Sequence, residues 1–107
     1  SKSGVVGATT GTVSNATAAI KYVRTGNVVH CTVQYNVATN GSGVGAGIIS
    51  GLPFLSVAGA TGAFRKGGDV GTYSVSDTDL YLWGPSNSYP FADGEGGTVS
   101  FTYFVAG

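Results

Sequence analysis

The chain has 107 residues, of which 42% are hydrophobic and only 9% are charged, against roughly 25% charged in an average soluble protein. Five basic and five acidic side chains cancel to a formal net charge of zero. This composition excludes a basic nucleic-acid-binding surface and an acidic disordered tail, and it predicts one domain with a tendency to self-associate.

Short strands separated by polar turns are expected along the whole chain. Valine, threonine and tyrosine are typical of strands, and no window shows the spacing of an amphipathic helix. About eight strands at this spacing predict an all-β fold, an antiparallel β-sandwich or jelly roll. The expected strands are Val5–Thr9, Ala18–Thr25, Asn27–Val37, Gly45–Ser50, Ser56–Phe64, Thr72–Ser76, Asp79–Trp83 and Thr98–Val105.

The first hairpin can be checked by its register. If Gly26 and Asn27 form a two-residue turn, Val23 lies opposite His30 and Tyr22 lies opposite Cys31. The apolar alternations of the two strands are then in phase, which supports the turn. The face predicted to form the core carries Ile20, Tyr22, Arg24, Val29, Cys31, Val33, Tyr35 and Val37.

His30 and Cys31 are the only histidine and the only cysteine of the chain. Adjacent residues of a strand point to opposite faces, so Cys31 is expected inside and His30 outside. The two side chains therefore cannot form a nucleophile–base pair or jointly bind a metal within the strand. We expect no metal and no cofactor.

One ordered set of residues resembles a known domain. From Ala18 to Ser56 the chain carries Tyr22, Arg24, Gly26-Asn27, a valine-rich alternating strand, a glycine-rich turn and the sequence Gly-Leu-Pro-Phe at Gly51–Phe54. This set resembles a recurrent domain near the C-terminal ends of bacteriophage tail fibres and tailspikes.

The resemblance implies a β-sandwich module of the virion, usually trimeric, taken from the C-terminal end of a longer fibre or spike protein. Its implied role is recognition of a bacterial surface polysaccharide or lipopolysaccharide, or alternatively trimerisation and capping of the fibre with no ligand of its own. The pattern is not found beyond Ser56, so no functional residue is carried over from the family.

A sugar-binding site needs an aromatic surface for the apolar face of a sugar ring and polar groups for its hydroxyls. The segment Leu80–Gly97 offers both, and the candidate ligand-binding residues are Tyr81, Trp83, Asn87, Tyr89 and Asp93. The competing interpretation is structural: Leu80 and Leu82 alternate with Tyr81 and Trp83, and whichever pair faces inward belongs to the core.

Other polar residues have weaker functional interpretations. Asp77 and Asp79, if extended, share a face and suggest calcium binding or glycoside hydrolysis, although turn chemistry explains them better. The pair Asp93 and Glu95 suggests calcium binding in the same way. Arg65–Asp69 reads as an exposed hairpin loop that is either solvated or in contact with an anionic sugar. No nucleophile or acid–base set is coherent, so we expect no enzymatic activity.

Three residues at the first hairpin are candidates for the oligomer interface. Val23 and Val28 are apolar although the register places them on the outward face beside the turn. Arg24 falls on the apolar face instead, where it is expected to reach past the edge of the core or to pair with a carboxylate from another strand or subunit.

The chain has no apolar run near the length of a membrane-spanning helix and no segment typical of a signal peptide, so no membrane insertion is expected. It also has no methionine, which indicates a piece of a longer protein or the loss of the initiating residue.

Overall fold

The computed structural model describes residues 2–58, 61–66, 69–84, 90 and 93–106. All regular structure in these residues is extended, so the all-β prediction is confirmed, and none of them belongs to a helix that could span a membrane. The strands are β1 (Lys2–Thr10), β2 (Asn15–Thr25), β3 (Val28–Thr39), β4 (Val44–Ser50), β5 (Ser56–Ala58), β6 (Thr61–Lys66), β7 (Asp69–Ser76), β8 (Asp79–Trp83) and β9 (Glu95–Val105).

The expected strand Ser56–Phe64 is divided into β5 and β6, which makes nine strands rather than about eight. Both strands pair with β9: Ala58 lies opposite Phe104, and Arg65 lies opposite Thr98. The two pairings differ by one residue in register, and such a shift interrupts the regular ladder. Residues 56–58 and 61–64 of the segment are therefore extended, as predicted, and differ in register against β9, while residues 59 and 60 lie outside the described residues.

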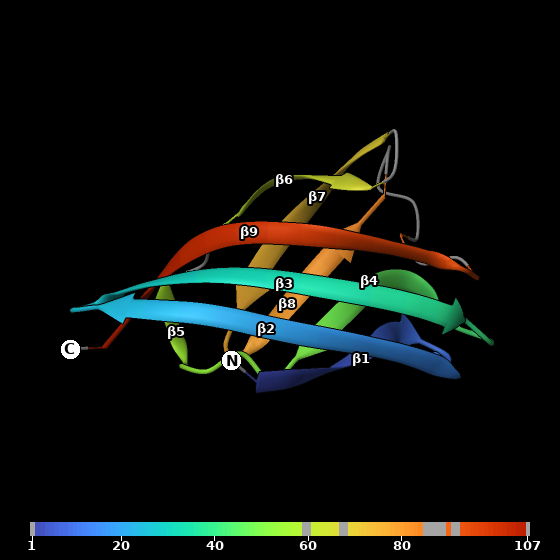
Figure 1. The fold of residues 1–107 in the computed structure, drawn as a ribbon, viewed down its shortest axis with the longest axis horizontal. Helices are drawn as coiled ribbons and strands as arrows, with labels where there is room; N and C mark the ends of the chain where they lie inside the picture. Colours follow the sequence, from blue (N-terminus) through green and yellow to red (C-terminus); the bar gives the residue numbers. More distant parts are fainter. Residues whose placement is uncertain (1, 59–60, 67–68, 85–89, 91–92, 107) are drawn as a thin grey trace.

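The strands form one antiparallel sheet that curls until its ends meet. The strand order is β3-β2-β1-β4-β8-β7-β6-β9-β5, and β3 also pairs with β9. Figure 1 shows β2, β3 and β9 in front, with β4, β7 and β8 crossing obliquely behind them. We call these two groups of strands the front layer and the back layer.

The core lies between the two layers and follows the alternation of the strands. The predicted register of the first hairpin is confirmed, with Tyr22 opposite Cys31, Val23 opposite His30 and Thr25 opposite Val28. Inward side chains are buried, and none of the buried side chains in the described part of the chain is charged. The largest fully buried ones are Tyr103, Ile20, Ile49, Leu80, Leu82, Val29, Val33, Val37, Val75, Val99 and Pro90.

The prediction that Tyr22 belongs to the core is wrong, whereas Arg24 reaches past the edge of the core, as one of its two expected placements has it. Tyr22 is 37% exposed and Arg24 is exposed, although both lie on the inward face of β2. The pairing of β1 with β2 ends at Lys2 and Ile20, so the tip of the hairpin extends beyond the neighbouring strand. The ring of Phe54 contacts both side chains there, edge-on to Tyr22 at 5.8 Å between centroids and 4.8 Å from the Arg24 guanidinium carbon.

The Gly-Leu-Pro-Phe segment forms a corner between β4 and β5, as its proline predicts. Leu52 is 3% exposed and donates its N–H to the Thr78 carbonyl at 3.0 Å. At Phe54 the Tyr103 hydroxyl donates to the backbone carbonyl at 3.0 Å and accepts from the backbone N–H at 3.3 Å. One buried side chain of β9 therefore satisfies both backbone groups of this corner residue.

Candidate functional site

The outer face of β8 carries two aromatic side chains. Leu80 and Leu82 point into the core and are fully buried, whereas Tyr81 and Trp83 are half-buried on the opposite face. Their rings are nearly parallel, with centroids 6.3 Å apart and an interplanar angle of 20°. Since successive side chains of a strand alternate in direction, burying the two leucines places both aromatic rings on the outside. We call Tyr81 and Trp83 the aromatic pair.

Hydroxyl groups border the aromatic pair on the neighbouring strand. Ser74 lies opposite Tyr81 and Thr72 lies opposite Trp83 in the ladder between β7 and β8. A hollow of about 650 Å³ opens beside Trp83 and is lined by Thr61, Gly62, Thr72, Tyr73 and Ser74 in addition to the indole. Aromatic surface and hydroxyl groups therefore meet on one outer face of the back layer.

One residue that lines the hollow is Gly62 of β6. A Cβ at Gly62 would lie 2.7 Å from the Tyr73 hydroxyl oxygen and 2.8 Å from carbons of the same ring. The Tyr73 ring therefore lies against bare backbone; it packs against the core and contacts Phe101 at 5.7 Å between centroids. A larger residue at position 62 would displace the Tyr73 ring.

This arrangement suits a ligand with both apolar and polar faces. Aromatic rings present a flat apolar surface, and the hydroxyl groups on the same face of the sheet both donate and accept hydrogen bonds. A pyranose ring has this dual character, with C–H groups on its faces and hydroxyls around its edge. The arrangement therefore offers a surface for binding such a ligand.

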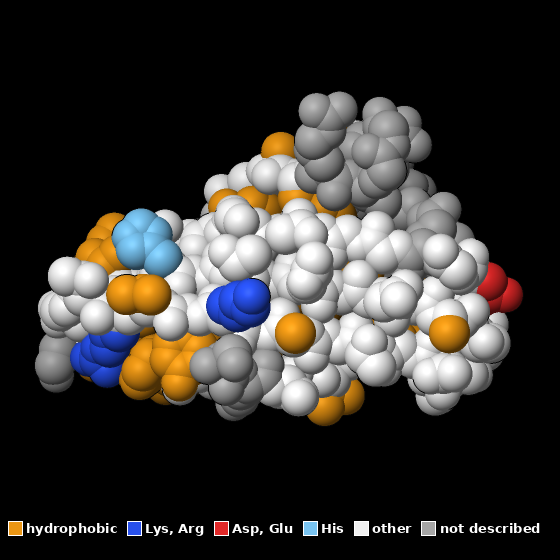
Figure 2. All heavy atoms as spheres, viewed as in Figure 1, with side chains coloured by type: hydrophobic (Ala, Val, Ile, Leu, Met, Phe, Trp, Pro, Cys, Tyr) orange, Lys and Arg blue, Asp and Glu red, His pale blue; other side chains and the backbone are white. Residues whose placement is uncertain are grey.

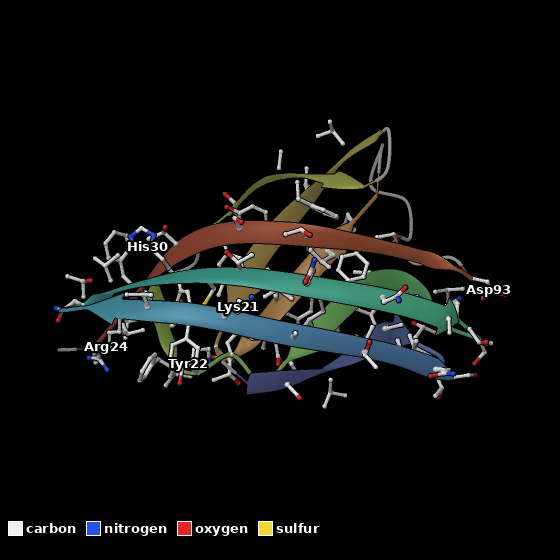
Figure 3. All side chains as sticks on the ribbon, in the orientation of Figure 1. Lys21, Tyr22, Arg24, His30 and Asp93 are labelled. Carbon is white, nitrogen blue, oxygen red and sulfur yellow. The ribbon has the colours of Figure 1, made fainter. Side chains whose placement is uncertain are left out.

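The other candidate ligand-binding residues are not part of this arrangement as described. Asn87 and Tyr89 lie outside the described residues. Asp93 is exposed, and its Oδ1 accepts the Asn40 N–H at 2.7 Å, while the adjacent Gly94 donates to the Val37 carbonyl at 2.7 Å. Figure 3 shows Asp93 beyond the ends of β3 and β9. The carboxylate thus fastens the start of the β3–β4 loop to the start of β9.

His30 and Cys31 point to opposite faces, as predicted. Cys31 is 2% exposed, and burial raises the pKa of its thiol to about 11, although a hydrogen bond with Tyr103 opposes the shift. The exposed His30 shares a hydrogen bond of 2.8 Å between its Nδ1 and the Thr102 hydroxyl. Among the described residues there is no group of three or more His, Cys, Asp or Glu side chains that could hold a metal ion.

Asp77 and Asp79 do not form the carboxylate pair that an extended segment would give. Ser76 pairs with Asp79, which leaves Asp77 and Thr78 as a two-residue turn, and Asp77 has a φ of 54°. Aspartate tolerates this left-handed conformation better than most residues do. The Asp77 carbonyl also accepts the Ser56 N–H at 2.9 Å. Turn chemistry therefore accounts for Asp77, and only Asp79 belongs to the outer face of β8.

A second surface lies at the tip of the first hairpin, on the outer face of the front layer. Val23 is 64% exposed, Phe104 is 53% exposed, and the half-buried Val28 lies directly opposite Phe104. Figure 2 shows hydrophobic side chains gathered around His30 at this end. We call Val23, Val28 and Phe104 the hairpin patch.

Arg24 lies on the other side of the hairpin from this patch. Its Nε donates to the Gly26 carbonyl and its Nη2 to the Ala106 carbonyl, both at 2.9 Å. Figure 3 shows Arg24 and Tyr22 on one side of the hairpin and His30 on the other. Arg24 therefore reaches past the edge of the core and connects the first turn to the end of β9.

Thr72, Ser74 and the hollow beside Trp83 were not identified from the sequence. The residues around Thr72 and Ser74 in the sequence are typical of any strand. The two hydroxyls lie beside the aromatic pair only because β7 pairs with β8 in this register. Comparison of the chain with protein-family models, with curated proteins and with solved structures finds no match. The resemblance to phage fibre domains therefore rests on the quoted residues alone.

Proposed function

We propose that this domain binds a bacterial surface glycan through the aromatic pair, as the receptor-recognition domain of a phage tail fibre or tailspike in the virion. The observation that supports the proposal is the geometry of Tyr81 and Trp83, whose nearly parallel rings lie on one outer face beside a hydroxyl-lined hollow. The sequence resemblance supports the phage context, and the physical argument supports the ligand class. No chemical step is part of the proposal.

Two aromatic rings left exposed on a sheet forgo the free energy of folding that burial of their apolar area would give. A buried aromatic side chain removes apolar area from water and is stabilised by roughly 25 cal/mol per Å². In this fold the adjacent leucines are buried while the aromatic pair stays half-exposed. A ligand that covers the two rings would remove their apolar area from water and so gain this free energy. The surrounding hydroxyls would orient the ligand by hydrogen bonds.

Weak single sites suffice when copies are linked. Joining several sites on one fibre raises overall avidity by a factor on the order of 10² to 10⁴. A shallow surface on each copy therefore supports firm attachment of a particle, provided that the copies engage the same cell surface.

The test is a bacterial glycan array probed with the parent domain and with Trp83→Ala and Tyr81→Ala variants. Trp83 is the only tryptophan, so its intrinsic fluorescence reports directly on this surface during a titration. We expect either variant to lower the affinity at least tenfold, about 1.4 kcal/mol. Leu55→Ala, which shortens a 59% exposed apolar side chain outside the aromatic pair, is the matched control. Glycan binding that survives loss of both rings would refute the assignment.

A structural role is the second candidate, and the hairpin patch favours it. Exposed apolar side chains on neighbouring strands suit contact between copies. Two residues before Val23, the same outer face of β2 carries Lys21, which lies opposite Thr32 of β3. We propose that three copies associate through Val23, Val28 and Phe104. In a purely structural module this association would occur without any glycan ligand.

Light scattering measures this association directly. We expect the mass of a trimer for the parent and the mass of a monomer for a Val23→Asp, Phe104→Asp double variant. Thr17→Asp introduces one such charge on the outer face of β2, about 20 Å from Val23 along the strand, and is expected to leave the mass unchanged. A monomeric parent would refute the interface, whereas a trimer that binds no arrayed glycan would favour the structural role.

A further inference from the structure

One transverse row of residues crosses the back layer through Tyr81. The ladder places Thr61 opposite Ser74, Ser74 opposite Tyr81, Tyr81 opposite Ile48, and Ile48 opposite Gly7. The row therefore crosses β6, β7, β8, β4 and β1 in that order and follows the curvature of the sheet. With neighbouring strands about 4.8 Å apart, it is roughly 19 Å long. We call it the transverse row.

All members of the transverse row face outward. Ser74 and Tyr81 alternate with the buried Val75 and Leu80, and Ile48 alternates with the buried Ile49. Gly7 follows Val6, which packs against the core, so position 7 belongs to the outer face of β1. The surface therefore changes along the row from hydroxyl groups, through an aromatic and an aliphatic side chain, to bare backbone.

Neither the backbone conformation nor crowding by the described residues requires a glycine at position 7. Its φ is not in the left-handed region, and a Cβ built on it meets no atom within 4 Å. The other glycine of β1 differs, because a Cβ at Gly4 would lie 3.0 Å from the Ser50 carbonyl oxygen and 3.1 Å from Ile20. Glycine weakens a strand interior, and it often marks either a bulge or a place where another molecule approaches the backbone closely. The bulge of β1 lies after Gly7, between Ala8 and Thr10, and Gly7 itself is paired regularly with Ile48.

We propose that an oligosaccharide of several sugar units lies along the transverse row and passes directly over Gly7. This inference depends on the proposed glycan binding and specifies its ligand: a chain longer than a disaccharide that crosses the strands, rather than a single terminal sugar held by the aromatic pair. One part of the chain stacks on Tyr81 and Ile48 and bonds to Ser74 and Thr61. The next part lies over β1, where any side chain would hold it away from the sheet.

The test introduces a side chain where the structure leaves space. Gly7→Leu adds bulk on the outer face, and Gly7→Ala adds only a methyl group that meets no neighbour. Ala19→Leu adds comparable bulk at an exposed position of the front layer and is the matched control. The probes are the polysaccharide that binds the parent most strongly on the array and its own disaccharide fragment. Each is titrated against Trp83 fluorescence for the variants that keep this residue, and Trp83→Ala, which lacks the only tryptophan, is compared with the parent on the array.

We expect Gly7→Leu to weaken polysaccharide binding about tenfold or more, to leave disaccharide binding unchanged, and to keep the thermal midpoint of the parent. Gly7→Ala is expected to give a smaller loss in the same direction with an equal or higher midpoint. If the Gly7 variants bind the polysaccharide as the parent does while Trp83→Ala loses it, the transverse path is wrong and the glycan site stands. An equal loss for both probes also contradicts the path. If Trp83→Ala has no effect either, or if no arrayed glycan binds, the proposed function itself fails.

Discussion

Replacing Tyr103 by phenylalanine removes one hydroxyl and leaves the ring that fills the core. In the parent this hydroxyl donates to the Phe54 carbonyl at 3.0 Å and accepts the Phe54 N–H at 3.3 Å. Tyr103 is fully buried, so in Tyr103→Phe no water can occupy the place of the hydroxyl without opening the core. The variant therefore tests whether the β9 side chain holds the Gly-Leu-Pro-Phe corner.

The expected loss follows from the two backbone groups that are left unpaired. A buried polar group without a partner costs about 1–3 kcal/mol. Phe54 is only partly buried, so solvent can satisfy one of its two groups, and we expect a total loss of about 2 kcal/mol. For a domain of this size such a loss lowers the thermal midpoint by about 10 °C.

Urea unfolding followed by Trp83 fluorescence measures this loss at a fixed protein concentration, since association of copies would shift the midpoint. The slope with denaturant is expected to be unchanged, because the variant alters no packing surface. Tyr22→Phe is the control: its half-exposed ring keeps the contact with Phe54, and we expect a change within about 0.5 kcal/mol. A Tyr103→Phe variant as stable as this control would refute the reasoning.

Three further predictions concern stability. Arg24→Ala loses two hydrogen bonds to backbone carbonyls and the contact with Phe54, so a loss of about 1–2 kcal/mol is expected, whereas Lys21→Ala should change little; equal thermal midpoints would show that the Arg24 side chain is merely solvated. Burial raises the pKa of Cys31 from 9.0 to about 11 and that of Tyr103 from 10.0 to about 12. The folded state therefore holds both protons more tightly than the unfolded state, so stability is full below pH 9 and falls as the pH rises towards 11 and 12, and a melting series should show a shallower decline for Cys31→Val. Gly45→Ala should destabilise the fold, because Gly45 has a φ of 90° and a Cβ there would overlap Thr9 Oγ1, while Gly7→Ala should be neutral or stabilising by up to about 1 kcal/mol; the opposite order in calorimetry would contradict the assignment of the two glycines.

The first hairpin shows how much of this fold is encoded locally. A two-residue turn at Gly26-Asn27 and two apolar alternations specify one register, and the structure keeps that register from Thr25 back to Ala16, with a shift only at Asn15. The inside position of Cys31 and the outside position of His30 follow from the same alternation. Such predictions succeed because the side-chain period of a strand depends only on the backbone of that strand.

Predictions that depend on a second layer could not be made in the same way. Tyr22 has the alternation of a core residue, yet it is exposed beyond the last described pair of β1 and β2, Lys2 and Ile20. At β8 the sequence left open whether the leucines or the aromatic pair would face inward. Burial of Leu80 and Leu82 between the two layers decides it.

By itself the sequence determined the strand content, the first turn and the alternation of side chains along a strand, because these depend on contacts between near neighbours in the chain. Only the tertiary structure decided which strands lie beside one another. Ser74, Tyr81, Ile48 and Gly7 form one outward row because β7, β8, β4 and β1 are adjacent in the sheet. Pairing between distant segments depends on how the whole chain buries its apolar faces, and no short stretch of sequence contains that information.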